Sequence, residues 1–183
     1  FAKSSSKIVE TFDYKILRHI LNTAGIVRFP EANFDMIRLG IGLYGISNIY
    51  QDKLENVSTL KSHISQIKEV NAGESVGYGR QGKANKKLRI AIVPIGYADG
   101  LSRALSKGVG KVLINNEFAK IVGNICMDMC MVDISDIETQ EGDEVIIFGE
   151  KFPIVEYAKA LNTIPYEILT NVSERVKRVY YHE

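Results

Sequence analysis

Residues 94–100 read Pro94-Ile95-Gly96-Tyr97-Ala98-Asp99-Gly100, and this segment sets the architecture of the chain. The apolar run from Ile90 to Ile95 predicts a buried strand that leads into the segment, and a glycine-rich turn carries the chain out of it. This arrangement places the phenol of Tyr97 at a sheet edge. A phenol in such a position is either a hydrogen-bonded packing group or an acid/base group.

The composition is that of an ordinary soluble globular protein, with 45% hydrophobic and 25% charged residues among 183. A net charge of +1 gives no reason to expect nucleic acid or an anionic membrane as a partner. No apolar run has the length that a membrane span needs. The first residues lack the layout of a signal peptide and an initiator Met. We therefore expect a cytoplasmic protein, and a chain that begins inside a longer one.

The two cysteines, Cys126 and Cys130, and the three scattered histidines do not predict a metal site. Zinc needs about four ligands at suitable spacing, and these residues do not supply them. On a strand, Cys126 and Cys130 would share a face but lie too far apart for a direct bond. We interpret them as two buried thiols in a reducing cytoplasm.

The first part of the chain predicts α/β structure. Apolar residues recur at i, i+4 from Lys7 to Leu21, which predicts an amphipathic helix. A strand is predicted from Asp35 to Gly40, and it leads into the G-x-G-x-x-G pattern of Gly40–Gly45. Neither a helical stripe nor a suitably placed acidic residue follows, so a dinucleotide site is not predicted. We interpret the glycines as sites where backbone N–H groups meet an anion such as a phosphate.

A polar segment without periodicity divides the chain into two parts. Residues 48–57 are predicted to be a linker between residues 1–47 and a domain of residues 58–183. In that domain short apolar runs alternate with turns, which predicts a mainly antiparallel β domain with short helices late in the chain. The expected strands are 60–70, 88–95, 110–114, 118–122, 125–134, 145–148 and 175–181, and the expected helices are 154–161 and 166–172.

Several motifs now stand together in one order along the chain. Three of them are Arg38–Gly45, Gly96–Gly100 and the segment Gly123-Asn124-Ile125-Cys126-Met127-Asp128. With Ile164-Pro165-Tyr166-Glu167 and the closing Arg175–Tyr180, they closely resemble the C-terminal half of alanine racemase. The resemblance covers nearly the whole chain, and its motifs are long.

The resemblance implies a pyridoxal 5'-phosphate enzyme that interconverts L-alanine and D-alanine for cell-wall peptidoglycan synthesis. It also implies a head-to-tail homodimer with active sites at the interface. Residues 1–47 would be the last units of a TIM-type α/β barrel, and residues 58–183 would be the C-terminal β domain. The residues in these motifs are most similar to those of the alanine racemase that is fused to a cell-wall amide ligase, which implies a ligase domain upstream.

The resemblance also implies roles for individual residues. Tyr97 matches the tyrosine that serves one face of the substrate from the partner subunit. Arg38 matches the arginine that faces the pyridine nitrogen of the cofactor, and His19 looks like a support for that arginine. Met127 matches a residue whose backbone contacts the substrate carboxylate across the dimer. Four residues match the family's contacts with the cofactor phosphate. Thr23 would supply a hydroxyl, Gly40 and Ile41 their backbone N–H groups, and Tyr166 a phenol.

The chemistry of racemisation explains these residue types. One α-proton leaves on one face and another returns on the opposite face, so two acid/base groups and a sink for the carbanion are needed, and pyridoxal phosphate is such a sink. A phenol has an unperturbed pKa of about 10, so it is a poor base at neutral pH unless a nearby cation lowers that pKa. A guanidinium stays protonated, so a ring nitrogen that faces Arg38 stays unprotonated, which suppresses transamination.

Three features depart from the family pattern. No lysine lies in the strand-end motif of the cofactor lysine, so we expect that lysine upstream and the isolated chain to be inactive. The stretch between Phe1 and His19 is shorter than the family usually has. Asn124 stands where many members have Arg, which changes the charge around the substrate channel.

Two other functions stay open on the sequence. One is a racemase for another amino acid such as serine. The other is a non-catalytic β module that dimerises or regulates a fused ligase. Taken alone, Tyr97, Tyr166 and Met127 would be packing residues, Arg38 a strand-edge charge and His19 a structural histidine on a helix.

Overall fold

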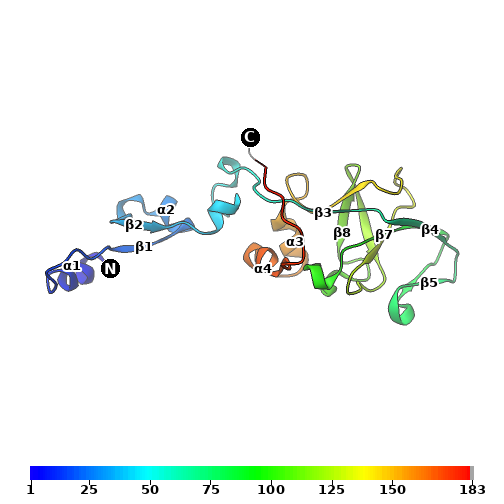
Figure 1. Cartoon of the computed structure of the whole chain (residues 1–183), viewed down its shortest axis with the longest axis horizontal. Helices are drawn as coiled ribbons and strands as arrows, with labels where there is room; N and C mark the ends of the chain where they lie inside the picture. The colour runs from blue at the N-terminus through cyan, green and yellow to red at the C-terminus, as the bar shows by residue number, and fades with distance from the viewer. Residues whose placement is uncertain (182–183) are drawn as a thin grey trace. The chain divides into compact units, whose positions relative to one another are not determined.

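The computed structural model describes residues 1–181, and the chain divides into two compact units, Phe1–Ser58 and the segment from Thr59 onward (Figure 1). The first unit has short helices and two strands. Its elements are α1 (Ala2–Val9), β1 (His19–Asn22), α2 (Thr23–Arg28), η1 (Pro30–Ala32), β2 (Met36–Arg38), η2 (Ile41–Tyr44) and η3 (Gln51–Lys53), where η denotes a 3₁₀ helix.

Strands β1 and β2 are parallel, with α2 in the connection between them. His19 lies opposite Met36, and Asn22 lies opposite Arg38. Because parallel strands end at the same edge of a sheet, the segments that follow the two strands lie together. This strand–helix–strand arrangement is the repeating unit of an α/β barrel. It places Thr23, which follows β1, beside Gly40, which follows β2.

The helix predicted from Lys7 to Leu21 is wrong in its extent. Helix α1 ends at Val9, and the turn beyond it closes where Thr11 Oγ1 donates to the carbonyl of Ile8 at 2.7 Å. His19 therefore lies on strand β1 and not on a helix. The backbone of β1 pairs with β2, so tertiary pairing outweighs the local i, i+4 pattern over the second half of the predicted helix.

The second unit is built on a seven-stranded antiparallel sheet with the order β3-β11-β8-β9-β10-β7-β4, which confirms the predicted mainly antiparallel domain. A separate hairpin pairs β5 (Ser75–Val76) with β6 (Gly82–Lys83), on either side of η4 (Tyr78–Arg80). The strands of the large sheet are β3 (Leu60–His63), β4 (Gln66–Val70), β7 (Leu88–Val93), β8 (Lys111–Ile114), β9 (Glu117–Val122), β10 (Cys130–Asp133) and β11 (Glu144–Phe148).

The two edge strands of this sheet are consecutive in the chain, so the sheet curls back on itself. The strand predicted over residues 60–70 forms as β3 and β4, which bend at Ile64 and Ser65. Ile64 N donates to the carbonyl of Asp143 beside β11, and Ser65 N donates to the carbonyl of Ile92 in β7, both at 2.9 Å. One bent segment thus continues the pairing of β3 with β11 and of β4 with β7 through the bend.

Aliphatic side chains fill the inside of the curled sheet. The residues that are less than 2% exposed include Val93, Val112, Ile121, Val132 and Val145, from five different strands. On β9 buried residues alternate with more exposed ones, as the period of a strand predicts. On β8 and β10 three consecutive residues are buried, so both faces of these strands are covered. Each buried side chain of this kind contributes about 1.5–3 kcal/mol relative to an exposed one. The strands therefore form a tightly packed core, and the turns described below connect to these strands.

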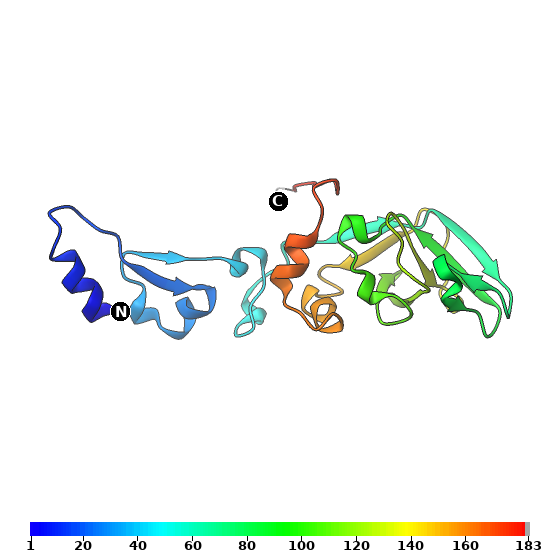
Figure 2. The same ribbon diagram turned by 90° about the horizontal axis from the view of Figure 1, so that it is seen from below.

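The helices expected late in the chain are confirmed as α3 (Ile154–Ala160) and α4 (Pro165–Asn171), which lie side by side at one end of the sheet (Figure 2). The strand predicted over residues 175–181 is wrong, because this segment is irregular up to Tyr181. The strand predicted over residues 125–134 is shortened to Cys130–Asp133. Its first residues form a tight turn, in which Cys126 N donates to the carbonyl of Met129 at 2.9 Å.

Both cysteines are free thiols, but their environments differ. Cys130 is fully buried on β10, as expected, whereas Cys126 lies in the tight turn and is half-buried. Burial, and to a smaller extent Cys126, raises the pKa of the Cys130 thiol to about 12. Within residues 1–181, no helix has both the length and the apolar character to cross a membrane.

The difference between the two thiols predicts their reactivity. At pH 8 a thiol with a pKa of about 12 is ionised to only about one part in ten thousand, and the thiolate is the nucleophile. We expect a thiol reagent such as Ellman's reagent to modify Cys126 in the native protein and both thiols in denaturant. The fast native reaction should be lost in Cys126→Ser and kept in Cys130→Ser. Equal native reactivity of the two thiols would contradict this placement.

Candidate active site

The tyrosine turn, defined here as Gly96–Gly100, follows strand β7 and contains the 3₁₀ helix η5 (Tyr97–Asp99). The side chain of Asp99 closes it, because Asp99 Oδ2 accepts a hydrogen bond of 2.8 Å from Gly96 N. Gly100 ends the turn with a φ of +107°, which a residue with a side chain rarely adopts. The Tyr97 side chain is 45% exposed, so it is presented at the surface and not packed in the core.

A second turn, the methionine turn Cys126–Met129, lies directly against the tyrosine turn. Tyr97 N donates to the carbonyl of Cys126 and Ala98 N donates to the carbonyl of Met127, both at 3.0 Å. A Cβ atom on Gly96 would lie 2.3 Å from the Met127 carbonyl oxygen, so the contact requires glycine. Met127 is 53% exposed, which is not the environment of a core residue. The two residues predicted from separate motifs are thus brought together.

Arg175 joins both turns, and sequence reasoning did not give it a role. Its Nε donates to Asp99 Oδ1 and its Nη2 donates to Asp128 Oδ1, each at 2.7 Å. The hydrogen bonds to Asp99 and Asp128 raise the pKa of Arg175. The signal in the sequence is an aspartate shortly after each of Tyr97 and Met127, together with an arginine in the closing motif. Alternating apolar residues around Arg175 instead predicted a strand.

In the first unit, Thr23 organises the turn that follows β2. Its Oγ1 accepts hydrogen bonds from Gly40 N at 3.0 Å and from Gly42 N at 3.3 Å. A Cβ on Gly42 would lie 2.9 Å from Thr23 Cγ2, so the backbone approaches this side chain closely. Thr23 is only 4% exposed. A hydroxyl accepts two hydrogen bonds and donates one, so with both acceptor positions used its proton is directed to a further acceptor. A hydroxyl oriented in this way can donate its hydrogen bond to an anionic oxygen.

Arg38 and His19 lie on the neighbouring strands β2 and β1, and no bond between them is found in the described part of the chain. Arg38 Nη2 donates instead to the carbonyl of Ile20 on β1 at 3.0 Å. His19 Nδ1 is buried and lacks a hydrogen-bond partner among residues 1–181. A buried nitrogen of this kind normally has a partner. The guanidinium of Arg38 is therefore bonded to the backbone of β1 and not to His19, whose buried Nδ1 is unsatisfied within residues 1–181.

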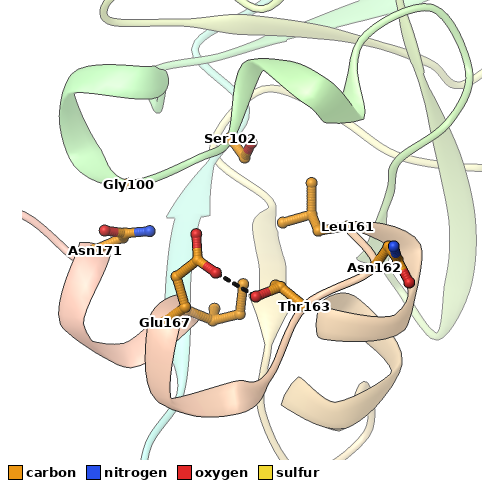
Figure 3. Close-up of a pocket in the computed structure, with 8 residues that line it drawn as sticks. Gly100, Ser102, Leu161, Asn162, Thr163, Glu167 and Asn171 are labelled. Atoms are coloured by element: carbon orange, nitrogen blue, oxygen red, sulfur yellow. Dashed lines mark hydrogen bonds between the residues drawn. The ribbon is translucent and has the colours of Figure 1, made fainter.

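Tyr166 lies in the first turn of α4, where Pro165 begins the helix. It is 49% exposed, so it is not a core residue. Helix α4 ends beside the tyrosine turn, because a Cβ on Gly100 would lie 2.5 Å from the Asn171 carbonyl oxygen. A shallow pocket separates the start of α4 from Gly100 and Ser102 (Figure 3). Thr163 donates to Glu167 within the pocket, whose lining contains no basic residue.

The parallel strand–helix–strand unit and the curled antiparallel sheet define the chain as an α/β segment followed by a β domain. Comparison with family models gives the same order: residues 1–48 match the N-terminal domain of alanine racemase, and residues 57–180 match its C-terminal domain. The chain belongs to the alanine racemase family.

Individual relatives agree with the family models. Alanine racemase 1 of Clostridium acetobutylicum is 44% identical over 174 residues, which are 90% of this chain and 45% of that protein. The structure of alanine racemase from Clostridium difficile 630 has a TM-score of 0.88 at 42% identity, with 97% of this chain and 47% of that chain covered. A structure from Bartonella henselae with covalently bound pyridoxal phosphate has a TM-score of 0.84 at 33% identity, with 97% and 50% covered. The chain thus spans about half the length of these relatives.

The close contact at Gly96 predicts a large effect of a single methyl group. Gly96→Ala places Cβ 2.3 Å from the Met127 carbonyl oxygen and 2.4 Å from that of Cys126, and backbone atoms cannot move aside. The φ of Gly96 is −140°, so alanine is not strained there and the clash is the whole effect. We expect the free energy of unfolding to fall by about 2–4 kcal/mol in urea denaturation.

Gly73→Ala is the matched control. Its Cβ would meet nothing within 4 Å, but its φ of +88° is unfavourable for alanine, which costs about 1 kcal/mol. Equal losses in the two variants would show that the turns do not pack as described.

Proposed function

We propose that this chain is the C-terminal half of an alanine racemase that interconverts L-alanine and D-alanine with pyridoxal 5'-phosphate. The observation that carries the proposal is the exposed Tyr97 phenol on a turn that main-chain hydrogen bonds hold to the Met127 turn. In this role Tyr97 Oη takes the α-proton of L-alanine, or returns a proton on that face. The backbone at Met127 binds the substrate carboxylate and orients the α-carbon.

The residues of the first unit suit the cofactor. Thr23, with the backbone at Gly40 and Ile41, forms the phosphate contact in this proposal. By the family resemblance, Tyr166 is a further residue proposed to bind the cofactor phosphate. Arg38 faces the ring nitrogen, and its guanidinium keeps a positive charge at every relevant pH. His19, with its unpartnered buried nitrogen, lies on the strand before Thr23. When bound, pyridoxal phosphate supplies the electron sink that makes the α-proton acidic.

The proposal requires parts that lie outside this chain. A lysine upstream holds the cofactor and serves the second face of the substrate. Tyr97 acts in the barrel of a partner subunit, so the enzyme is a homodimer with active sites at the interface. Residues 1–47 are the last units of this chain's own barrel, residues 48–57 link that barrel to the β domain, and residues 58–183 form the β domain. D-alanine from this reaction supplies peptidoglycan synthesis from the cytoplasm.

The proposed base is tested by Tyr97→Phe in the full-length protein, because phenylalanine keeps the ring and removes only the hydroxyl. We expect racemisation to fall by about 10²–10⁴-fold, the usual contribution of a general acid/base group. Cofactor binding, followed by the absorbance of the lysine-bound cofactor, should be unchanged. Tyr180→Phe is the matched control, because Tyr180 is an exposed phenol outside every proposed contact.

Three results would contradict this assignment. Near-normal racemisation in Tyr97→Phe would remove Tyr97 from the chemistry. If the wild-type protein with pyridoxal phosphate shows no cofactor absorbance and no alanine racemisation, a non-catalytic module is favoured. A faster reaction with serine than with alanine would change the assigned substrate. The isolated 183-residue chain should show no racemisation.

The phosphate contact is tested at Thr23. Thr23→Val keeps the shape but removes the acceptor of two N–H groups and the free O–H donor. The loss of about one hydrogen bond predicts a dissociation constant for pyridoxal phosphate about tenfold higher, measured by absorbance titration of the full-length apoenzyme. Thr23→Ser, which keeps the hydroxyl, should bind nearly as the wild type. Unchanged affinity in Thr23→Val would exclude Thr23 from the phosphate site.

A further inference from the structure

Arg175 forms a two-pronged ion pair with aspartates from two separate turns. Asp99 lies two residues after Tyr97, and Asp128 lies one residue after Met127. Arg175 Nε reaches the first carboxylate and Nη2 reaches the second, both at 2.7 Å. The described part of the chain contains no other basic side chain that bridges two carboxylates. One guanidinium therefore joins the two turns to which the proposed function assigns substrate contacts.

The segment that carries Arg175 is itself held in place. Arg178 Nη1 donates to the carbonyls of Ser173 at 3.0 Å and Val176 at 2.9 Å, and its Nη2 donates to that of Val172 at 3.0 Å. Ser173 N also donates to the carbonyl of Asp99 at 3.2 Å. The residues after α4 thus form a turn fixed against the tyrosine turn. Arg175 is presented from a defined backbone and not from a loose tail.

Asp99 transmits the effect of Arg175 to Tyr97. Its two carboxylate oxygens have separate tasks: Oδ2 accepts from Gly96 N, and Oδ1 accepts from Arg175. Asp99 is mostly buried, with its side chain 14% exposed. A rotation of this carboxylate would break the bond to Gly96 N, which closes the turn before Tyr97. The guanidinium therefore fixes the orientation of the carboxylate, and the carboxylate fixes the turn.

The arrangement is unlike an ion pair that serves stability alone. Arg175 and Asp128 are about half exposed, and ion pairs at that exposure stabilise a protein by about 0–1 kcal/mol. What the pairs do provide is geometry, because a planar guanidinium fixes two acceptors at a set distance and angle. A lysine cannot do this, since its ammonium is a point donor on a flexible stem.

We propose that Arg175 is a positioning residue, which holds the tyrosine turn and the methionine turn in register so that the Tyr97 phenol and the Met127 backbone reach the same substrate. This inference rests on the proposed function. A displacement of about 1 Å in such a contact can slow a reaction about a hundredfold. The loss of Arg175 affects the Tyr97 face of the substrate, whereas the opposite face depends on the lysine upstream.

The test uses this difference between the two faces. The full-length holoenzyme converts D-alanine in deuterium oxide, as wild type, Arg175→Ala or Arg175→Lys. Formation of L-alanine requires proton delivery by Tyr97, whereas deuterium incorporation into D-alanine with retained configuration requires only the lysine. We expect Arg175→Ala to form L-alanine about 10–100-fold more slowly, with deuterium incorporation changed by less than about twofold. Arg175→Lys should recover only part of the loss.

Lys61→Ala is the matched control, since it removes an equally short surface ion pair, with Glu144 at 2.6 Å, and should change neither rate. A proportional fall of both rates in the Arg175 variants, or no fall in either, would overturn the proposal. If Arg175→Ala does not give a native circular dichroism spectrum, the ratio of the two rates in Arg175→Lys decides. Failure of the proposed function is distinct from these outcomes, because the wild-type enzyme would then racemise no alanine.

Discussion

The main-chain hydrogen bonds between the tyrosine turn and the methionine turn are the constraint on which the functional end of the β domain depends. They form because strands β7 and β10 are antiparallel neighbours, with Val93 opposite Cys130. The end of β7 and the start of β10 therefore lie at the same end of the sheet. The turn that leaves one strand meets the turn that enters the other, and the lack of a side chain at Gly96 lets the two backbones touch.

Because of these hydrogen bonds, the positions of the two turns depend on the positions of β7 and β10 in the sheet. The bent segment at Ile64 and Ser65 joins the two edge strands of the curled sheet and bonds to Asp143 beside β11 and to Ile92 in β7. A curled sheet with a tightly packed aliphatic core resists sliding of one strand past another. The relative position of β7 and β10 is thereby fixed, and with it the position of the two turns. The side chains that reach the surface at this end are held by backbone, in the way a preorganised site requires.

The parts of this arrangement that could be predicted from the sequence are those that a local signal determines. The strands predicted at 110–114 and 118–122 form as β8 and β9, and Asn115 and Asn116 between them adopt positive φ values, 48° and 67°, that asparagine tolerates. The segment after α4 could not be predicted in the same way, because Arg175 binds the carboxylates of Asp99 and Asp128, which are distant in sequence. The end of α1 was likewise missed, since strand pairing with β2 decides the state of the residues around His19.

The site was predicted as a set of residues, but not as a geometry. Long motifs identified Tyr97 and Met127 separately, and only the structure shows that their turns bond to each other. The same applies to Thr23 and Gly40, which lie 17 residues apart in sequence and are joined by one hydrogen bond of 3.0 Å. A motif reports which residue types are present. The pairing of their backbones depends on sheet register, which no single motif contains.

Asn124 shows how a departure from the family pattern fits this scheme. Its Nδ2 donates to the carbonyl of Tyr78 at 3.1 Å, so a neutral amide ties the η4 turn to the residues just before the methionine turn. Lys107 is bound to the same region, because its N donates to the carbonyl of Gly123 and its Nζ donates to Gln81 Oε1. The backbone just before the methionine turn is therefore held by a neutral amide from one side and by Lys107 from the other. Both contacts are hydrogen bonds to main-chain carbonyls, so the position of this segment needs no charge at residue 124.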